Sequence, residues 1–206
     1  MNVSTRWGAR ALLTSLCALL LTACASPSPA PVLLTLPPAL TAATLAPPAP
    51  GGTAPALAVR RVAIPEYMVA RRVRYRADAA TLAEWPNTYW AERIEIGVSR
   101  EFVSALRQQL PGWTLCDTNC GDQVPTLTLN VDLVPMDYLR GAQKLTARAR
   151  ITVSGGGAVP QVLQVVEKSY EMPGNGDSAQ AQAQAITELI RQVAVVTAPL
   201  IQSAPR

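Results

Sequence analysis

The sequence has 206 residues, 49% of them hydrophobic, and a formal net charge of +4, but it contains no histidine. Without histidine a Ser-His-Asp triad or a Cys-His pair is impossible, and the commonest zinc ligand is missing. No phosphate-binding glycine motif or nucleophile elbow occurs, so the sequence predicts a non-enzymatic protein without cofactor or metal. Carboxylate pairs such as Glu92 and Glu95 leave a carboxylate-based hydrolase as an alternative.

The first 23 residues have the pattern of a secretory signal peptide. Two arginines precede an apolar run, residues 11–21, which is about half as long as a membrane-spanning helix. Residues 21–24 (LTAC) resemble a bacterial lipobox, in which an aliphatic residue and two small ones precede a cysteine. We expect cleavage before Cys24 and lipidation of its thiol; the alternative is an ordinary signal peptide. Ala25, where aspartate would favour the inner membrane, favours the outer membrane by analogy.

The segment after Cys24 has a composition that packs no core by itself. Nine of the eighteen prolines fall in residues 25–56, mixed with alanine and threonine. We expect a lipidated tether at 24–31 and a Pro/Ala-rich loop at 37–56, with a first strand at 32–36 between them. The folded domain is predicted over 32–203. Cleavage leaves 16 of the 18 basic residues against 14 acidic ones, which gives no reason to expect a nucleic-acid partner.

Two short strands and a long helix are predicted next. LAVRRVAIP begins a strand at Leu57 that Pro65 ends, and RRVRYRA predicts another strand at 71–77. Apolar residues then recur every four positions, which predicts an amphipathic helix over 88–110, closed by a Pro-Gly pair. Its apolar stripe comprises Trp90, Ile94, Val98, Phe102, Leu106 and Leu110.

Cys116 and Cys120, in CDTNC, are the cysteines left once the leader is removed and Cys24 is lipidated. In the oxidising periplasm they are predicted to form a structural disulfide. A reduced pair and a redox-active pair are alternatives, although thioredoxin-like motifs have two intervening residues and this one has three.

Three alternating segments predict a strand meander over 126–133, 145–153 and 162–170. Pairing of Asp132 with Arg148 or Arg150 would favour the register of the first two strands. A final helix follows the candidate N-caps Asp177 and Ser178. Its apolar stripe comprises Ile186, Leu189, Ile190, Val193, Val196 and Leu200. Together these elements predict an α/β or α+β fold, a single layered domain in which two helices pack on a mixed β-sheet.

The order of these segments resembles that of the ABC-type transport auxiliary lipoproteins, the family that includes PqiC. The shared features are the lipobox, the early strand, VAIPEYM (62–68), the arginine-rich strand, YWAERI (89–94), the meander and the final helix. The sequence departs from the family pattern at residues 68–71 and at Arg93, where the family often has proline.

The resemblance implies a periplasm-facing, outer-membrane lipoprotein that docks an MCE-domain protein and its ABC or membrane transporter. Such systems move phospholipid or other hydrophobic cargo between membranes and support envelope integrity. Homo-oligomer formation is compatible with this role. The alternative, from another functional class, is an envelope scaffold or an activator of a cell-wall enzyme.

Aromatic and arginine residues gather in one stretch of a chain that is only 5% aromatic, which makes it the candidate partner-binding site. Trp85 is placed on a loop before Pro86, as either a lid on the core or a partner contact. Gln182 and Gln184 are taken as neutral positions of the last helix. The candidate contacts are Tyr67, Arg72, Arg74, Trp85, Tyr89 and Trp90. The arginines of the stretch are Arg60, Arg61, Arg71, Arg72, Arg74 and Arg76, suited to phosphate headgroups or an acidic partner, or simply to a solvated strand face.

Overall fold

The computed structural model describes residues 29–39, 54–116, 120–121, 123–156 and 161–205. The chain divides into two compact units, Met1–Ala30 and Pro31–Arg206, and of the first only Pro29 and Ala30 are described. Cys24, its lipobox, and the signal peptide therefore lie outside the described residues, as do much of the tether and residues 40–53 of the loop.

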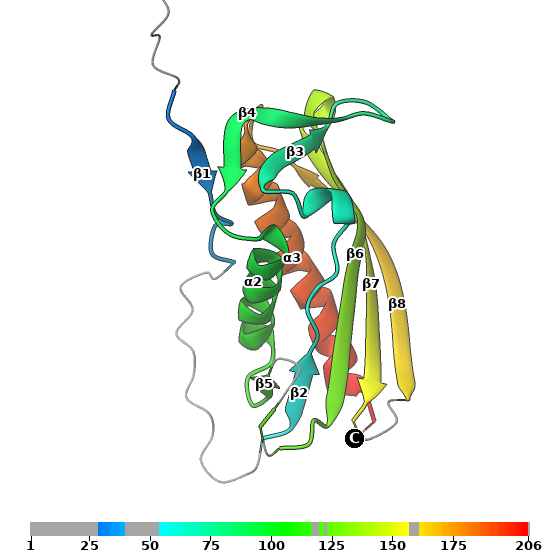
Figure 1. Cartoon of the computed structure of the whole chain (residues 1–206). Helices are drawn as coiled ribbons and strands as arrows, with labels where there is room; N and C mark the ends of the chain where they lie inside the picture. Colours follow the sequence, from blue (N-terminus) through cyan, green and yellow to red (C-terminus); the bar gives the residue numbers. More distant parts are fainter. Residues whose placement is uncertain (1–28, 40–53, 117–119, 122, 157–160, 206) are drawn as a thin grey trace, which may run out of the picture. The chain divides into compact units, whose positions relative to one another are not determined.

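Eight strands and two long helices make up the second unit (Figure 1). The strands are β1 (Val32–Leu34), β2 (Ala56–Val59), β3 (Arg72–Arg76), β4 (Leu82–Trp90), β5 (Thr114–Cys116), β6 (Leu127–Leu139), β7 (Lys144–Gly155) and β8 (Val162–Pro173). The helices are α2 (Ile94–Gln109) and α3 (Ala179–Ser203), and short 3-10 helices occur at Glu66–Met68 and Arg140–Ala142. No helix in the described part has both the length and the apolarity to cross a membrane.

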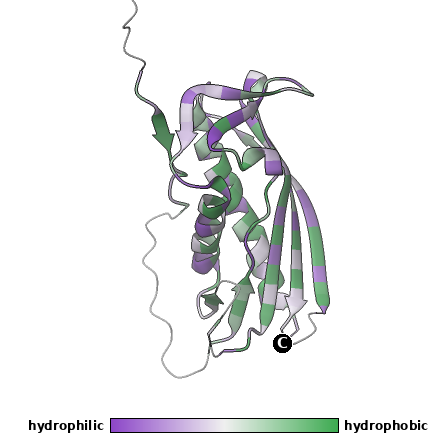
Figure 2. Ribbon diagram, in the orientation of Figure 1, coloured by the Kyte–Doolittle hydropathy of each residue, from purple (hydrophilic) through white to green (hydrophobic). Residues whose placement is uncertain are grey.

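The strands β6, β7 and β8 form the predicted antiparallel meander. Every second side chain of β7 is buried from Leu145 to Val153, and Figure 2 shows the alternation as bands of opposite hydropathy. Asp132 lies opposite Arg150 in the β6–β7 register, which is one of the two charge pairs expected. Cross-strand pairs of opposite charge stabilise a register, so this position supports the pairing that the core requires.

The other edge of β6 pairs with two separate strands. Near the start of β6, the strand β2 runs parallel to it, and β5 in turn runs parallel to β2. Near the end of β6, Arg76 of β3 lies opposite Leu139. Between them the Ala63 amide donates to Val131 (3.0 Å), and the Leu133 amide donates to the Ala63 carbonyl (2.8 Å). The strands β4 and β1 extend the sheet beyond β3. The mixed sheet and two helices confirm the predicted single α/β domain.

Both helices bury one apolar stripe against the sheet and against each other. The helices α2 and α3 pack together, α3 contacts β7 and β8, and Figure 1 shows both on the same side of the meander. The predicted stripes are confirmed from Ile94 to Leu110 and from Ile186 to Val193, all buried, while Val196 and Leu200 are partly buried against the core. Burial of such stripes is the main source of helix stability in a protein.

Ser178 is the N-cap of α3, as predicted. Its hydroxyl oxygen accepts a hydrogen bond from the Ala181 amide at 3.1 Å, which satisfies one of the free amides of the first turn. The other candidate, Asp177, instead forms an ion pair with Arg140, whose Nε lies 2.7 Å from its Oδ1.

The predicted start of the first helix is wrong. Residues 82–90 form β4, antiparallel to β3, and the helix begins only at Ile94. Trp90 lies four residues before Ile94 and so extends the apolar repeat of the helix, although it belongs to the strand. Both residues are buried in the core where β4 leads into α2. The predicted strand at 57–65 is likewise shorter: β2 ends at Val59, and only Ala63 bridges to β6 beyond it.

Candidate docking surfaces

Arg72, Arg74 and Arg76 alternate along β3 and so lie on one side of the strand. We call the surface formed by these arginines and by the β4 residues opposite them the β3–β4 face. Arg74 lies opposite Glu84 in the strand register. The Glu84 carboxylate forms ion pairs with two arginines: Arg72 Nη1 lies 3.3 Å from its Oε2, and Arg74 Nε lies 3.4 Å from its Oε1. The Arg72 guanidinium also lies 5.2 Å from the centre of the Tyr89 ring, a cation–π contact.

The third arginine of this face, Arg76, pairs with Asp137 of β6. Its Nη2 lies 3.0 Å from Oδ1 of Asp137, and the Tyr67 hydroxyl donates to the same oxygen at 3.0 Å. The hydrogen bond to Asp137 raises the pKa of Arg76, while burial and the nearby Asp137 carboxylate raise the pKa of Tyr67. The positive charges of the β3–β4 face are therefore largely matched within the chain.

Trp85 lies inside the protein, so its predicted position on a loop is wrong. It is a β4 residue, 6% exposed, with its ring centre 4.8 Å from that of Tyr75. Its indole Nε1 donates to Gln182 Oε1 at 2.7 Å, and Gln182 Nε2 donates to the Arg74 carbonyl at 2.7 Å. Gln182 is fully buried, so it is no neutral position; Gln184 is exposed, as expected.

Arg140 covers this aromatic pair from outside. Its guanidinium lies 5.0 Å from the Tyr75 ring centre and 4.5 Å from that of Trp85. It donates to both carboxylate oxygens of Asp177, at 2.7 and 3.0 Å, and to the Tyr75 hydroxyl at 2.8 Å. This pairing lowers the pKa of Asp177 and raises that of Arg140. The contacts join the β6–β7 turn to the start of α3, so the cluster supports the fold.

Trp90 is 2% exposed and belongs to the core. With Trp85 it is thereby removed from the surface of the folded chain. Among the six predicted contacts Arg72 is the exposed one, with 51% of its side chain accessible, and Tyr89 is half-buried beside it. Tyr67 and Arg74 are half-buried within the ion-paired cluster.

A second surface is a groove of about 480 Å³ between α2, the chain that follows β2, and β5. We call it the arginine groove, because Arg60 and Arg61 line it from the chain after β2 and Arg100 and Arg107 line it from α2. All four are exposed. None of the described residues that line the groove is a carboxylate.

The charges of the arginine groove are mostly unmatched. Arg100 pairs with Glu92 at 2.6 Å and with Glu101 at 3.1 Å, both outside the lining. The other three guanidinium groups form no ion pair with any carboxylate of the described residues. Among the described residues this surface therefore carries positive charge without a paired carboxylate, which the β3–β4 face does not.

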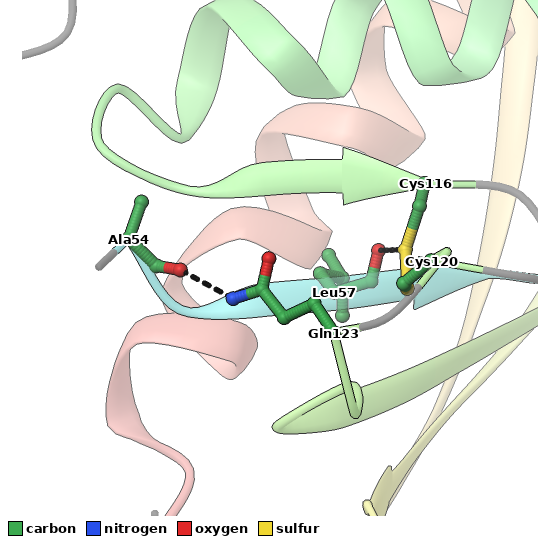
Figure 3. Close-up of a disulfide and its surroundings, with 5 residues drawn as sticks. All are labelled: Ala54, Leu57, Cys116, Cys120 and Gln123. Carbon is green, nitrogen blue, oxygen red and sulfur yellow. Dashed lines mark hydrogen bonds between the residues drawn. A yellow bond between two sulfur atoms is a disulfide. The ribbon is translucent and has the colours of Figure 1, made fainter.

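A disulfide between Cys116 and Cys120 borders the groove, since Cys116 belongs to its lining (Figure 3). The two Cα atoms are 5.2 Å apart, within the usual range for such a bond. Cys116 Sγ lies 3.4 Å from the Leu57 carbonyl oxygen, and Gln123 Nε2 donates to the Ala54 carbonyl at 2.9 Å. These contacts hold β5 and the chain after it against β2, which steadies one wall of the groove.

Comparison with known proteins places the chain in a family. Residues 35–194 match the family model described as the ABC-type transport auxiliary lipoprotein component. The chain belongs to this family. The resemblance drawn from the sequence is thereby confirmed, and the protein is a lipoprotein component auxiliary to ABC-type transport. Among the described residues, no cluster of three or more histidine, cysteine or carboxylate side chains could hold a metal.

Two solved structures share the fold of this auxiliary lipoprotein. One, of a protein described as uncharacterized, has a TM-score of 0.64 at 18% identity and covers 84% of this chain and 99% of its own. The other, protein XCC0632 from Xanthomonas campestris, has a TM-score of 0.55 at 16% identity, covering 84% and 93% respectively. No curated protein matches the chain significantly.

Sequence reasoning missed the helical half of the arginine groove. Ile96, Arg100 and Arg107 lie outside the apolar stripe of α2, so the stripe alone does not reveal the surface that they form. The available signal was their spacing, because residues 96, 100, 103 and 107 recur at helical intervals and so share one face. That this face lies beside Arg60 and Arg61 follows only from the packing of α2 against β2 and β5.

Proposed function

We propose that this auxiliary lipoprotein docks an MCE-domain protein within an intermembrane lipid transport system that includes an ABC transporter. In this role it would link the transporter to the opposite membrane and so support envelope integrity. Docking requires a surface that binds protein, and needs no catalytic group.

The observation that carries the proposal is the arginine groove in a member of an auxiliary transport family. Arginine is enriched at the centres of protein interfaces because its guanidinium group makes several directional hydrogen bonds to carboxylates. Three arginines, Arg60, Arg61 and Arg107, have no carboxylate partner within the described part of the chain, so a partner's carboxylates can pair with them. Arg72 and Tyr89, with Tyr67 and Arg74 behind them, are proposed as a second, smaller contact.

We propose further that residues 1–23 are removed and that Cys24 is lipidated, so that 24–31 tether the domain to the periplasmic face of the outer membrane. Two or more acyl chains hold a protein stably on a bilayer. Cys24→Ala is expected to leave an unprocessed or unanchored form. Intact-mass measurement that finds a mature N-terminus elsewhere and no acyl mass would contradict this part of the proposal.

Co-purification tests the docking function directly. The full-length lipoprotein would be tagged at its C-terminus and expressed with the MCE-domain protein of its own transport system, then captured from detergent-solubilised membranes. We expect the MCE-domain protein to be retained at stoichiometric levels. Retention of a cell-wall synthase instead, with the MCE-domain protein in the flow-through, would contradict the proposal and favour an enzyme activator.

A further inference from the structure

The arginine groove combines two features that together define the chemistry of its occupant. The first is charge: four guanidinium groups line it, three of them without a carboxylate partner among the described residues. The second is an apolar floor formed by Ile96, Val103 and Leu115. Ile96 is 41% exposed, whereas the other isoleucines of the two helices are buried.

The positive charge is distributed along the groove. Arg100 and Arg107 are seven residues apart on α2, about 10 Å along the helix axis, and Arg60 and Arg61 come from a different element. A single phosphodiester headgroup carries one negative charge and so balances one of the three unmatched positive charges, even where its oxygens accept hydrogen bonds from more than one guanidinium group. Several carboxylates spaced along one segment of chain would match all of them.

The shape of the site also favours a protein segment over an acyl chain. The space is a surface groove bordered by a helix and two short strands. A ligand with a long acyl chain gains affinity when a concave pocket buries most of its surface. A groove floor beside a helix instead suits apolar side chains that project from a second chain at helical spacing.

We propose that the arginine groove binds an acidic amphipathic segment of the partner protein, with its apolar side chains on Ile96, Val103 and Leu115 and its carboxylates on Arg60, Arg61 and Arg107. This inference rests on the proposed docking function and names the chemistry of the docked segment. Electrostatic complementarity of this kind speeds association and selects the partner, and the buried apolar contacts slow dissociation.

The test uses the full-length chain, overlapping labelled peptides that cover the periplasmic part of the MCE-domain protein, and vesicles of phosphatidylglycerol or phosphatidylcholine. One variant carries Arg60→Glu with Arg107→Glu. The matched control carries Arg148→Glu with Lys168→Glu, which changes the net charge equally on exposed residues of β7 and β8 that lie outside the groove lining. Peptide binding is measured by fluorescence anisotropy at two salt concentrations, and vesicle binding by co-sedimentation.

We expect the wild-type chain to bind peptides that combine acidic and apolar residues, and the groove variant to weaken binding by at least about tenfold. The control should change it little, and added salt should weaken the wild-type complex. Equal binding by the groove variant, or preference for neutral or basic peptides, would overturn the inference. So would an absence of peptide binding together with arginine-dependent binding to phosphatidylglycerol vesicles.

Capture of the intact partner separates this inference from the docking function. If the wild-type chain and the groove variant both retain the intact MCE-domain protein, and to the same extent, the docking function stands and the groove assignment fails. If neither retains it, the proposed function fails as well. Melting curves of both variants confirm that a loss of binding does not come from unfolding.

Discussion

The β3–β4 face and half of the arginine groove draw their arginines from one short stretch of sequence, residues 60–76, yet these arginines differ in what they contact. On the β3–β4 face Arg72, Arg74 and Arg76 each have a carboxylate within 3.4 Å. In the groove, Arg60 and Arg61 have none among the described residues. The number of arginines therefore says little about binding. What matters is whether the fold supplies their counter-charges.

The physical origin of the difference is strand register. Antiparallel pairing of β3 with β4 brings Glu84 opposite Arg74, and the last residues of β3 meet β6 close to Asp137. The chain after β2 instead runs beside α2, where Glu92 and Glu101 are paired with Arg100 and Glu95 is paired with Arg93. Arg74 and Arg76 are therefore assigned to the fold, and the arginines of the groove, with the exposed Arg72 as a smaller contact, to a partner.

Trp85→Ala should have the largest effect on stability, because it empties a buried site beneath the β3–β4 face. Replacing a buried tryptophan by alanine costs about 3–5 kcal/mol. We expect the melting temperature to fall by about 10 °C. If Trp85 were a surface contact, the melting curve would be unchanged, and the comparison between the two surfaces would break.

Gln182→Ala should have the next largest effect. It removes the acceptor of the Trp85 indole and the donor to the Arg74 carbonyl, both at 2.7 Å. Leaving such buried groups unsatisfied costs about 1–3 kcal/mol. Gln184→Ala, two residues away and exposed, is the control and should leave the melting temperature within error. Equal shifts for both variants would mean that the effect belongs to the helix and not to the contact.

Asp177 should make a smaller, acid-sensitive contribution. Arg140 holds its folded pKa below the usual value of about 3.8, so the stabilisation is fully present above that pH and is lost as pH falls through the folded pKa. The melting temperatures of wild type and Asp177→Asn should therefore differ most at neutral pH and converge in acid. A difference that stays constant or grows below pH ~3 would contradict this linkage.

Arg72→Gln should have the smallest effect. Its side chain is 51% exposed, and it shares Glu84 with Arg74, so the pair is largely screened by water. Exposed ion pairs contribute about 0–1 kcal/mol. A double-mutant cycle of Arg72→Gln with Tyr89→Leu, in which the free energy of unfolding is measured by chemical denaturation, would give the coupling energy of the cation–π contact. A large coupling energy would assign Arg72 to the fold as firmly as Arg76.

Much of the fold could be predicted because its signals are local. The alternation in β6 and β7 and the apolar stripe of α3 determine which side chains are buried, so these elements are predicted from the sequence and found in the structure. The strand β4 could not be predicted in this way. It contains Pro86 and Asn87, with a positive φ of 48° at Asn87, and its last residue continues the spacing of the following helix.

The candidate site was harder to predict because it depends on contacts between distant elements. The abundance of arginine near residues 60–76 is visible in the sequence. Glu84 and Asp137, which pair with three of those six arginines, become their partners only through strand pairing. Arg107 joins Arg60 only because α2 lies beside β2. No spacing rule along the chain links these residues.

One paired measurement tests the central claim most directly. Two double variants, Arg60→Gln with Arg107→Gln and Arg74→Gln with Arg76→Gln, each remove two positive charges from the full-length chain. For both, the melting temperature and the affinity for the intact MCE-domain protein are measured in the same buffer. We predict that the groove variant loses affinity by about tenfold at an unchanged melting temperature, while the β3–β4 variant melts earlier and, while folded, binds normally. The opposite pattern would contradict the account.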